Sequence, residues 1–159
     1  MRTRSLLLLV TFALLTLPAC TSSGQFAFYQ DGHASDGPAL GSVTLASQQA
    51  GHVTFAPANC YAGDERQFLG GDFVDAKAEM SLRFVIDPLD GPAVRAFDLK
   101  DPDDRSVVFH RRECRTFQFK IERTGLTVND VDEYRISLDL DCASSAGTLT
   151  AKVGSDSCL

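Results

Sequence analysis

The chain has 159 residues, of which 44% are hydrophobic and 23% charged, and its formal net charge is −6 at pH 7. This length fits one domain with a real hydrophobic core, and the ordinary composition without repeats excludes disordered and collagen-like proteins. Because an acidic chain repels nucleic-acid phosphates, we expect no nucleic-acid partner.

The first nineteen residues have the pattern of a secretory signal. Arg2 and Arg4 give a basic start, residues 6–17 are almost wholly apolar, and the small Ala19 ends the segment. A helix of that apolar length spans only ~18 Å at ~1.5 Å per residue, well short of the ~30 Å hydrocarbon core of a bilayer. We therefore expect residues 1–19 to form a signal helix that is removed on maturation, and not a transmembrane anchor.

The end of this segment, Leu17-Pro18-Ala19-Cys20, resembles the lipobox of bacterial lipoproteins. The resemblance implies that the Cys20 thiol carries diacylglycerol and that cleavage makes Cys20 the first mature residue. Two or three acyl chains, at about 0.8 kcal/mol per buried methylene, hold a protein on a membrane nearly permanently. Thr21 is not the aspartate that retains lipoproteins on the inner membrane of enteric bacteria, so the resemblance favours the outer membrane. An ordinary secretory cleavage nearby is the alternative.

Residues 20–41 have the composition of a lipidated tether, because Gly, Ser, Asp and Pro interrupt any periodic pattern. Phe26 and Phe28 alternate with polar or small residues, so a short edge strand is the alternative. Removal of residues 1–19 leaves 13 basic residues against 21 acidic ones, a net charge of −8. That charge repels anionic lipid head groups, as suits a body held away from the bilayer.

From residue 42 to the C terminus, apolar and polar residues alternate with period two, the pattern of half-buried β-strands. The segments are 43–45, 53–55, 80–86, 93–99, 107–109, 117–121, 134–142 and 149–153. About eight short strands at intervals near ten residues predict an all-β domain over 42–159, either an antiparallel β-sandwich or a partly open barrel. Only residues 64–73 could hold a short helical turn, which Gly70-Gly71 would end.

Four cysteines remain once Cys20 is assigned to lipid, namely Cys60, Cys114, Cys142 and Cys158. An even number in an exported domain predicts two disulfides. The sequence allows three pairings, and we favour Cys60–Cys114 with Cys142–Cys158, because the second would close a terminal hairpin of about sixteen residues and contribute roughly 3 kcal/mol. No spacing fits a zinc site and no C-x-x-C motif is present, so we expect structural disulfides and no bound metal.

The body also carries a resemblance. The run from Arg123 to Val131, followed by Leu138-Asp139-Leu140-Asp141-Cys142, is similar to small exported lipoproteins of myxobacterial type. Residues 57–61 and the turn at 87–92 are similar to the same group. These proteins are largely without an assigned activity, so the resemblance implies the layout and the four structural cysteines but no catalytic residues.

No residue grouping typical of catalysis stands out. The G-x-S-x-G motif of serine hydrolases is missing from the sequence, and His33, His52 and His110 are scattered without an adjacent nucleophile and acid. We therefore expect surface histidines, no catalytic residues and no cofactor.

Two acidic clusters could contribute calcium ligands, because calcium takes six to eight oxygen ligands. The clusters are Asp101, Asp103 and Asp104, and Asn129, Asp130, Asp132 and Glu133. Neither has the glycine and distal glutamate of a known calcium loop, and the first is ordinary turn chemistry. We favour solvated acidic turns.

Arg111, Arg112 and Arg115 concentrate positive charge around Cys114 on an acidic body. Guanidinium groups bind carboxylates and phosphates through paired hydrogen bonds, so the cluster could dock an anionic envelope glycan, a lipid phosphate or an acidic protein. The alternative is charge balance with neighbouring acids such as Glu113.

Two functions fit these residues. The first is a lipid-anchored, non-enzymatic β domain of the cell envelope that binds a protein or glycan or has a structural role. The second is a small hydrolase or carbohydrate-active enzyme in which acids among residues 101–104 act together with Glu113. Paired carboxyl groups in glycosidases lie ~5–9.5 Å apart across a cleft, so the geometry of these acids distinguishes the two.

Overall fold

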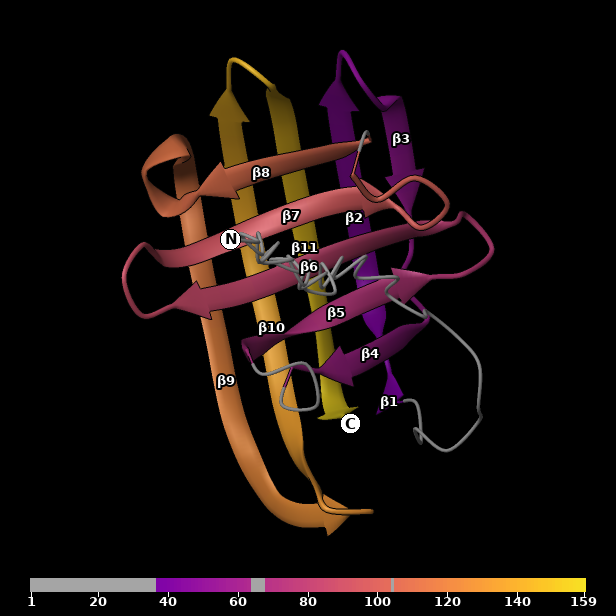
Figure 1. Cartoon of the computed structure of the whole chain (residues 1–159), viewed down its shortest axis with the longest axis vertical. Coiled ribbons are helices and arrows are strands. Elements are labelled where there is room, and N and C mark those ends of the chain that lie inside the picture. The colour runs from indigo at the N-terminus through magenta and orange to yellow at the C-terminus, as the bar shows by residue number, and fades with distance from the viewer. Residues whose placement is uncertain (1–36, 64–67, 104) are drawn as a thin grey trace, which may run out of the picture. The chain divides into compact units, whose positions relative to one another are not determined.

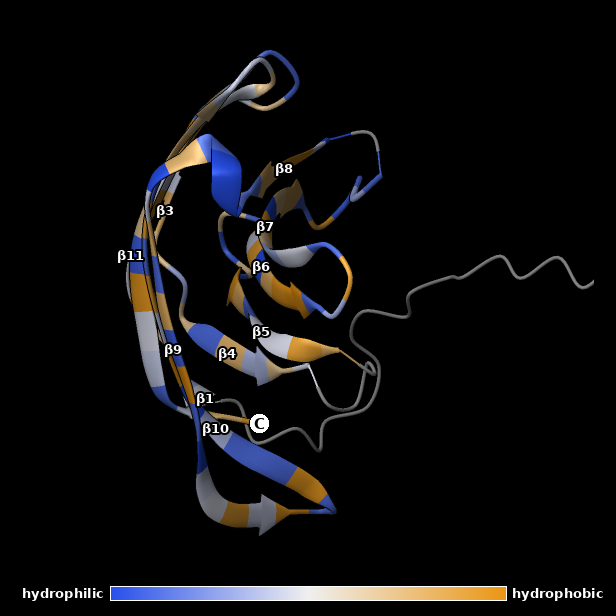
Figure 2. Ribbon diagram, turned by 90° about the vertical axis from the view of Figure 1, so that its left-hand side faces the viewer, coloured by the Kyte–Doolittle hydropathy of each residue, from blue (hydrophilic) through white to orange (hydrophobic). Residues whose placement is uncertain are grey.

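The computed structural model describes residues 37–63, 68–103 and 105–159. Over these ranges the chain forms eleven β-strands, arranged as two antiparallel sheets that pack face to face (Figures 1 and 2). The prediction of an all-β antiparallel sandwich is confirmed, and the sheets do not close into a barrel. The predicted signal peptide and the tether up to residue 36 lie outside the described residues.

One layer is a six-stranded sheet with the order β1-β4-β5-β6-β7-β8. Its strands are β1 (Gly37–Pro38), β4 (Asn59–Ala62), β5 (Leu69–Asp75), β6 (Met80–Asp87), β7 (Gly91–Asp98) and β8 (Ser106–His110). The predicted turn chemistry joins β6 to β7. The Asp87 carboxylate there accepts hydrogen bonds from the backbone N–H groups of Leu89 at 2.7 Å and Asp90 at 2.9 Å.

The other layer is a five-stranded sheet with the order β3-β2-β11-β10-β9. Its strands are β2 (Leu40–Ser47), β3 (Gly51–Phe55), β9 (Cys114–Val128), β10 (Val131–Ser144) and β11 (Gly147–Cys158). Strands β9 and β10 are longer than the alternation predicts. They run on to a two-residue turn at Asn129 and Asp130, whose φ angles of 51° and 67° fit a tight hairpin.

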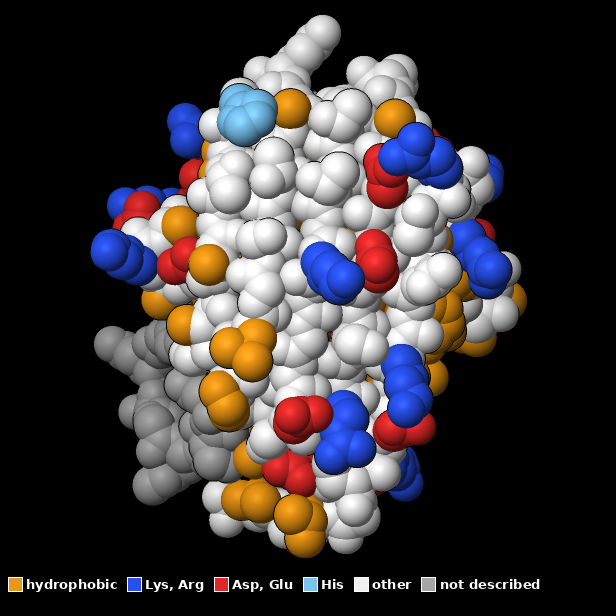
Figure 3. All heavy atoms as spheres, turned by 180° about the vertical axis from the view of Figure 1, so that it is seen from behind, with side chains coloured by type: hydrophobic (Ala, Val, Ile, Leu, Met, Phe, Trp, Pro, Cys, Tyr) orange, Lys and Arg blue, Asp and Glu red, His pale blue; other side chains and the backbone are white. Residues whose placement is uncertain are grey.

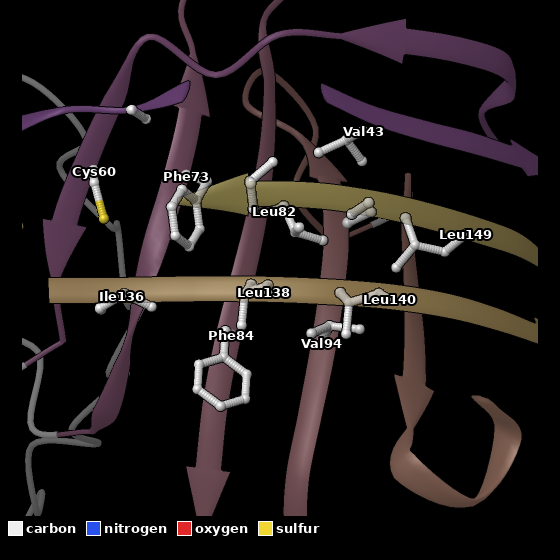
Figure 4. Packing of buried hydrophobic residues seen from close by; sticks show 14 of the residues in the cluster. Val43, Cys60, Phe73, Leu82, Phe84, Val94, Ile136, Leu138, Leu140 and Leu149 are labelled. Atoms are coloured by element: carbon white, nitrogen blue, oxygen red, sulfur yellow. The ribbon is translucent and has the colours of Figure 1, made fainter. Parts of the chain in front are cut away.

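The core lies between the two sheets and consists of the alternating apolar positions. Figure 4 shows side chains of the six-stranded sheet facing those of the five-stranded sheet. The first group is Phe73, Leu82, Phe84 and Val94, and the second is Val43, Ile136, Leu138, Leu140 and Leu149; each is 2% exposed or less. Because alternate residues of each strand face this core, the strands lie across it, and the loops that join them lie at the edges of the sandwich.

Three strands were missed by the alternation: β1, β4 and β5. Residues 69–73, expected to allow a helical turn, belong to β5, and residues 64–67 lie outside the described part. Gly70 interrupts the apolar alternation that would have indicated a strand. The packing nevertheless requires glycine at this position, because a Cβ there would lie 2.0 Å from the Phe84 carbonyl oxygen. The predicted tether also ends too late, since residues 37–41 already lie in β1, β2 or the residue between them.

The four predicted cysteines do form two disulfides, but the pairing that we favoured is wrong. Cys60 bonds Cys158 with a Cα–Cα distance of 4.8 Å, and Cys114 bonds Cys142 at 3.8 Å. Cys142 and Cys158 cannot meet because β10 and β11 are antiparallel: Cys142 lies opposite Leu149, whereas Cys158 lies at the other end of the hairpin. One bridge joins the two sheets and the other joins β9 to β10.

Candidate functional site

The chain crosses from one sheet to the other at the 3-10 turn η2 (Arg111–Glu113), which carries two of the predicted arginines. The turn is held at both ends. The Glu113 carboxylate accepts a hydrogen bond from the His110 backbone N–H at 2.8 Å, and the Cys114 backbone N–H donates to the Arg111 carbonyl. Because Cys114 is also bridged to β10, the backbone that carries the arginines is well fixed.

A hollow of about 460 Å³ lies beside this turn and is lined by Asp90, Pro92, His110, Arg111 and Arg112. The first two residues come from the β6–β7 connection and the start of β7. They reach the hollow because Ala93 pairs with His110 across the β7–β8 ladder. Strand pairing therefore brings together residues that are about twenty positions apart in the sequence.

Arg111 and Arg112 differ in their charge environment from most other cations of the domain. Eight described Lys and Arg side chains form ion pairs: Arg83, Arg95, Lys100, Arg105, Arg115, Lys120, Arg123 and Arg135. Arg111 and Arg112 are exposed, and neither forms an ion pair with another described residue. Their guanidinium donors are thus available to an external carboxylate or phosphate.

Asp90, the acid that lines the hollow, belongs to a turn that the Asp87 carboxylate orders. Hydrogen bonds from the backbone N–H groups of Asp90 and Leu89 lower the pKa of Asp87 below its ordinary value. Asp87 therefore stays ionised while it orders the turn that places Asp90 at the hollow. With two arginines against Asp90, the hollow carries a local positive charge on an acidic protein.

Arg115 does not join the other two arginines. Its side chain is exposed on β9 and is paired with Asp141 on the adjacent strand β10. The structure thus brings Arg111 and Arg112 together with His110 at the hollow. Arg115 instead balances the charge of a neighbouring acid, the alternative that the sequence left open for all three arginines.

Some acids of the two predicted clusters form ion pairs within the domain. In the β7–β8 loop, Asp103 lies 3.6 Å from Arg95, while Asp104 lies outside the described residues. The loop and Glu113 are at opposite ends of β8, whose backbone spans roughly 13 Å at about 3.3 Å per residue. The acids therefore do not face each other across one cleft as the pair of a glycosidase does.

The second cluster surrounds the β9–β10 turn. Asp132 lies 3.1 Å from Arg123 and accepts a hydrogen bond from Thr127 at 3.1 Å. Hydrogen bonds from the hydroxyl groups of Ser157 and Thr124 lower the pKa of Glu133. In the described ranges, no group of three His, Cys, Asp or Glu side chains could hold a metal ion.

The remaining histidines lie away from the hollow. His52 is exposed on the edge strand β3, and His33 is outside the described residues. Each of the four hollows that we describe is lined by one carboxylate at most. No arrangement of nucleophile, base and orienting acid emerges around them.

A buried ion pair on the outer face of the six-stranded sheet was not predicted. Asp72, which is 1% exposed, accepts hydrogen bonds from Arg83 at 2.7 and 2.9 Å. The Arg83 guanidinium also lies 5.3 Å from the ring centroids of Phe68 and Phe97. Sequence alternation places Arg83 on the polar face of its strand and does not show what packs over that face, and it missed the strand that carries Asp72.

The outer face of the five-stranded sheet has a hollow of about 470 Å³ along β9, β10 and β11. Leu40, which is 76% exposed, contributes apolar surface to it, and Lys120, Asp139 and Lys152 contribute charge. Figure 3 shows this face as mainly polar, with basic and acidic side chains side by side. This surface of mixed charge has less charge selectivity than the hollow beside η2, where two arginines face one acid.

No protein-family model, curated protein or solved structure matches the chain. In the described part of the chain, no helix combines the length and apolarity needed to cross a bilayer. Three features of the chain bear on its function: the paired cysteines, the hollow beside η2 and the apolar N-terminal segment that ends at Cys20.

Proposed function

We propose that the protein is a lipid-anchored binding domain of the bacterial cell envelope, similar to small exported lipoproteins of myxobacterial type. Residues 1–19 are removed, Cys20 carries the acyl chains, and the disulfide-braced sandwich is held at a membrane, the outer one rather than the inner. The observation that carries the proposal is the cysteine pairing. Cys60–Cys158 and Cys114–Cys142 leave Cys20 as the one cysteine of the sequence without a disulfide partner in the chain.

The disulfides support export independently of the N-terminal motif. Disulfides persist in oxidising compartments and are rare in the cytosol. The bridge between Cys60 and Cys158 spans 98 residues and joins the two sheets, so its loss in a reducing compartment would weaken the whole sandwich. A structure braced in this way suits the cell envelope.

The binding role rests on Arg111 and Arg112. Two exposed guanidinium groups without described ion-pair partners border a hollow on an otherwise acidic domain. Their chemistry fits a ligand that carries carboxylate or phosphate groups, such as an anionic envelope glycan or an acidic protein segment. We propose no enzyme function, because the acids considered for it, Glu113 and residues 101–103, lie at opposite ends of β8.

Lipid attachment is tested by replacing Cys20, whose sulfur would carry the diacylglycerol, with serine. Cys20→Ser should leave the protein unprocessed or release it from acyl attachment, whereas the matched Thr21→Ser control should be processed and fractionate as the native chain does. The measurement is membrane fractionation after labelling with a radioactive fatty acid. Incorporation of label into the Cys20→Ser chain, or unchanged fractionation of that chain after removal of the signal segment, would contradict the proposal.

A further inference from the structure

The β9–β10 hairpin extends past the rest of the sandwich (Figures 1 and 2). Its outer part, residues 124–133, is called the hairpin tip below. Residues 125–130 are all exposed, and among them Leu126 is 62% and Val128 38% exposed. Burial in the sandwich core therefore does not account for the two aliphatic side chains.

The hairpin tip has one apolar and one polar face. Leu126 and Val128 are two residues apart on β9, so they share a face, and Val131 is the cross-strand partner of Val128. On the opposite face, Thr127 and Asp132 are joined by a hydrogen bond of 3.1 Å. The tight turn at 129–130 holds the two strands together, so the apolar residues form one small surface.

This tip lies at the end of the domain where the described part of the chain begins, at Gly37. Gly37 is packed so closely on β11 that an added Cβ would lie 1.1 Å from the Ser157 carbonyl oxygen. The Ser157 hydroxyl in turn donates a hydrogen bond of 2.5 Å to Glu133, and the Thr124 hydroxyl donates one of 2.5 Å to the same carboxylate. Glu133, at the base of the hairpin tip, is therefore hydrogen-bonded to Ser157 of β11, the residue against which Gly37 packs.

We propose that the apolar face of the hairpin tip rests on the lipid surface to which Cys20 is anchored, an inference that depends on the proposed function. The chain between Cys20 and Gly37 spans at most ~60 Å when fully extended. The anchor therefore keeps the tip at a high effective concentration near the bilayer, so a small apolar surface is enough for contact. The contact is shallow, with aliphatic side chains at the boundary of head groups and acyl chains.

The charges of the tip select the kind of lipid. Arg123 is paired with Asp132, and no described ion pair neutralises Asp130 at the turn. An acidic domain with an unpaired carboxylate at its tip is repelled by anionic head groups. The structure therefore favours a zwitterionic lipid surface over an anionic one, with the difference largest at low ionic strength.

The experiment uses the lack of tryptophan in the chain. Leu126→Trp places a single tryptophan on the tip, and Leu89→Trp places one in the β6–β7 turn, where the native side chain is 93% exposed. Both full chains are isolated from membranes and reconstituted in phosphatidylcholine vesicles with brominated acyl chains. Leu126→Trp should show blue-shifted emission that the bromine quenches, while Leu89→Trp should show neither effect. Val128→Trp serves as the second probe if the first variant fails to fold.

Equal emission from tip and control, without quenching, would overturn the inference. A blue shift that rises with protein concentration but is not quenched would also overturn it, because the tip would then pack against a second copy. Mass measurement of the Cys20 peptide in the same sample tests the anchor separately. If Cys20 carries no acyl chain, the proposed function fails. The inference about the tip can then still be tested, because coupling the Cys20 thiol to a maleimide lipid anchors the chain chemically and the same quenching measurement shows whether the tip contacts the bilayer.

Discussion

The two disulfides should differ measurably in their contribution to stability. In the chain-entropy model, a bridge that closes a loop of 98 residues contributes about 4.7 kcal/mol, and one that closes 28 residues contributes about 3.6 kcal/mol. Cys60 and Cys158 are also fully buried, whereas Cys114 is partly exposed. Replacing the first pair by alanine therefore costs the larger loop entropy and also leaves a cavity in the core.

The double variants Cys60→Ala/Cys158→Ala and Cys114→Ala/Cys142→Ala form a matched pair. Equilibrium unfolding in guanidinium chloride, followed by far-UV circular dichroism, gives the free energy of unfolding of each. We expect the first variant to be at least about 1 kcal/mol less stable than the second, since the two loop terms differ by that much. The reasoning is refuted if the Cys114/Cys142 variant is the less stable of the two.

Three further predictions concern charged groups. Asp72→Asn leaves the Arg83 guanidinium without its buried anionic partner and should lower the free energy of unfolding by about 3–5 kcal/mol in chemical denaturation. Arg111→Ala/Arg112→Ala should reduce the capture of anionic envelope components in pull-downs, most clearly at low salt. Because the pKa of Glu133 is lowered in the folded state, its contribution is present above its ordinary value of 4.5 and lost as pH falls through the folded pKa. Glu133→Gln should therefore flatten the acid limb of a plot of urea midpoint against pH.

Each of these has a control that the structure supplies. Asp156→Asn removes an exposed partner of Arg135 and should cost less than about 1 kcal/mol; a similar cost at Asp72 would mean that burial of its ion pair is unimportant. Lys77→Ala/Lys152→Ala removes two other cations without described ion pairs, and equal loss of capture would argue against a specific arginine site. An unchanged acid limb in Glu133→Gln would argue that its hydrogen bonds are not maintained in solution.

Alternation along the chain predicted the fold class and much of the core, because period-two burial is a local property of each strand. Leu82 and Phe84, and Ile136 to Leu140, occupy the faces that the pattern assigns to them. The pattern failed at β5, where close approach of the Phe84 carbonyl requires Gly70, which is not part of a turn. Local propensity could not show that contact, since it depends on the neighbouring strand β6.

The disulfide pairing and the hollow could not be predicted from the sequence either, because both depend on contacts between segments that are distant in the chain. The disulfide pairing depends on the packing of one sheet on the other, which places Cys60 beside the end of β11, and on strand register, which places Cys114 opposite Cys142. The hollow beside Arg111 depends on the β6–β7 connection, which the ladder between β7 and β8 brings alongside. The arginine cluster was visible as composition, but only packing separates Arg115, which is paired, from the two arginines that are not.

Mass spectrometry of the N-terminal peptide, taken from protein isolated with membranes, tests the lipid anchor most directly. The expected peptide begins at Cys20 and carries the mass of a thioether-linked diacylglycerol, with or without an acyl group on the amine. A peptide with an unmodified Cys20 thiol, or a mature chain that begins elsewhere, would contradict the anchor.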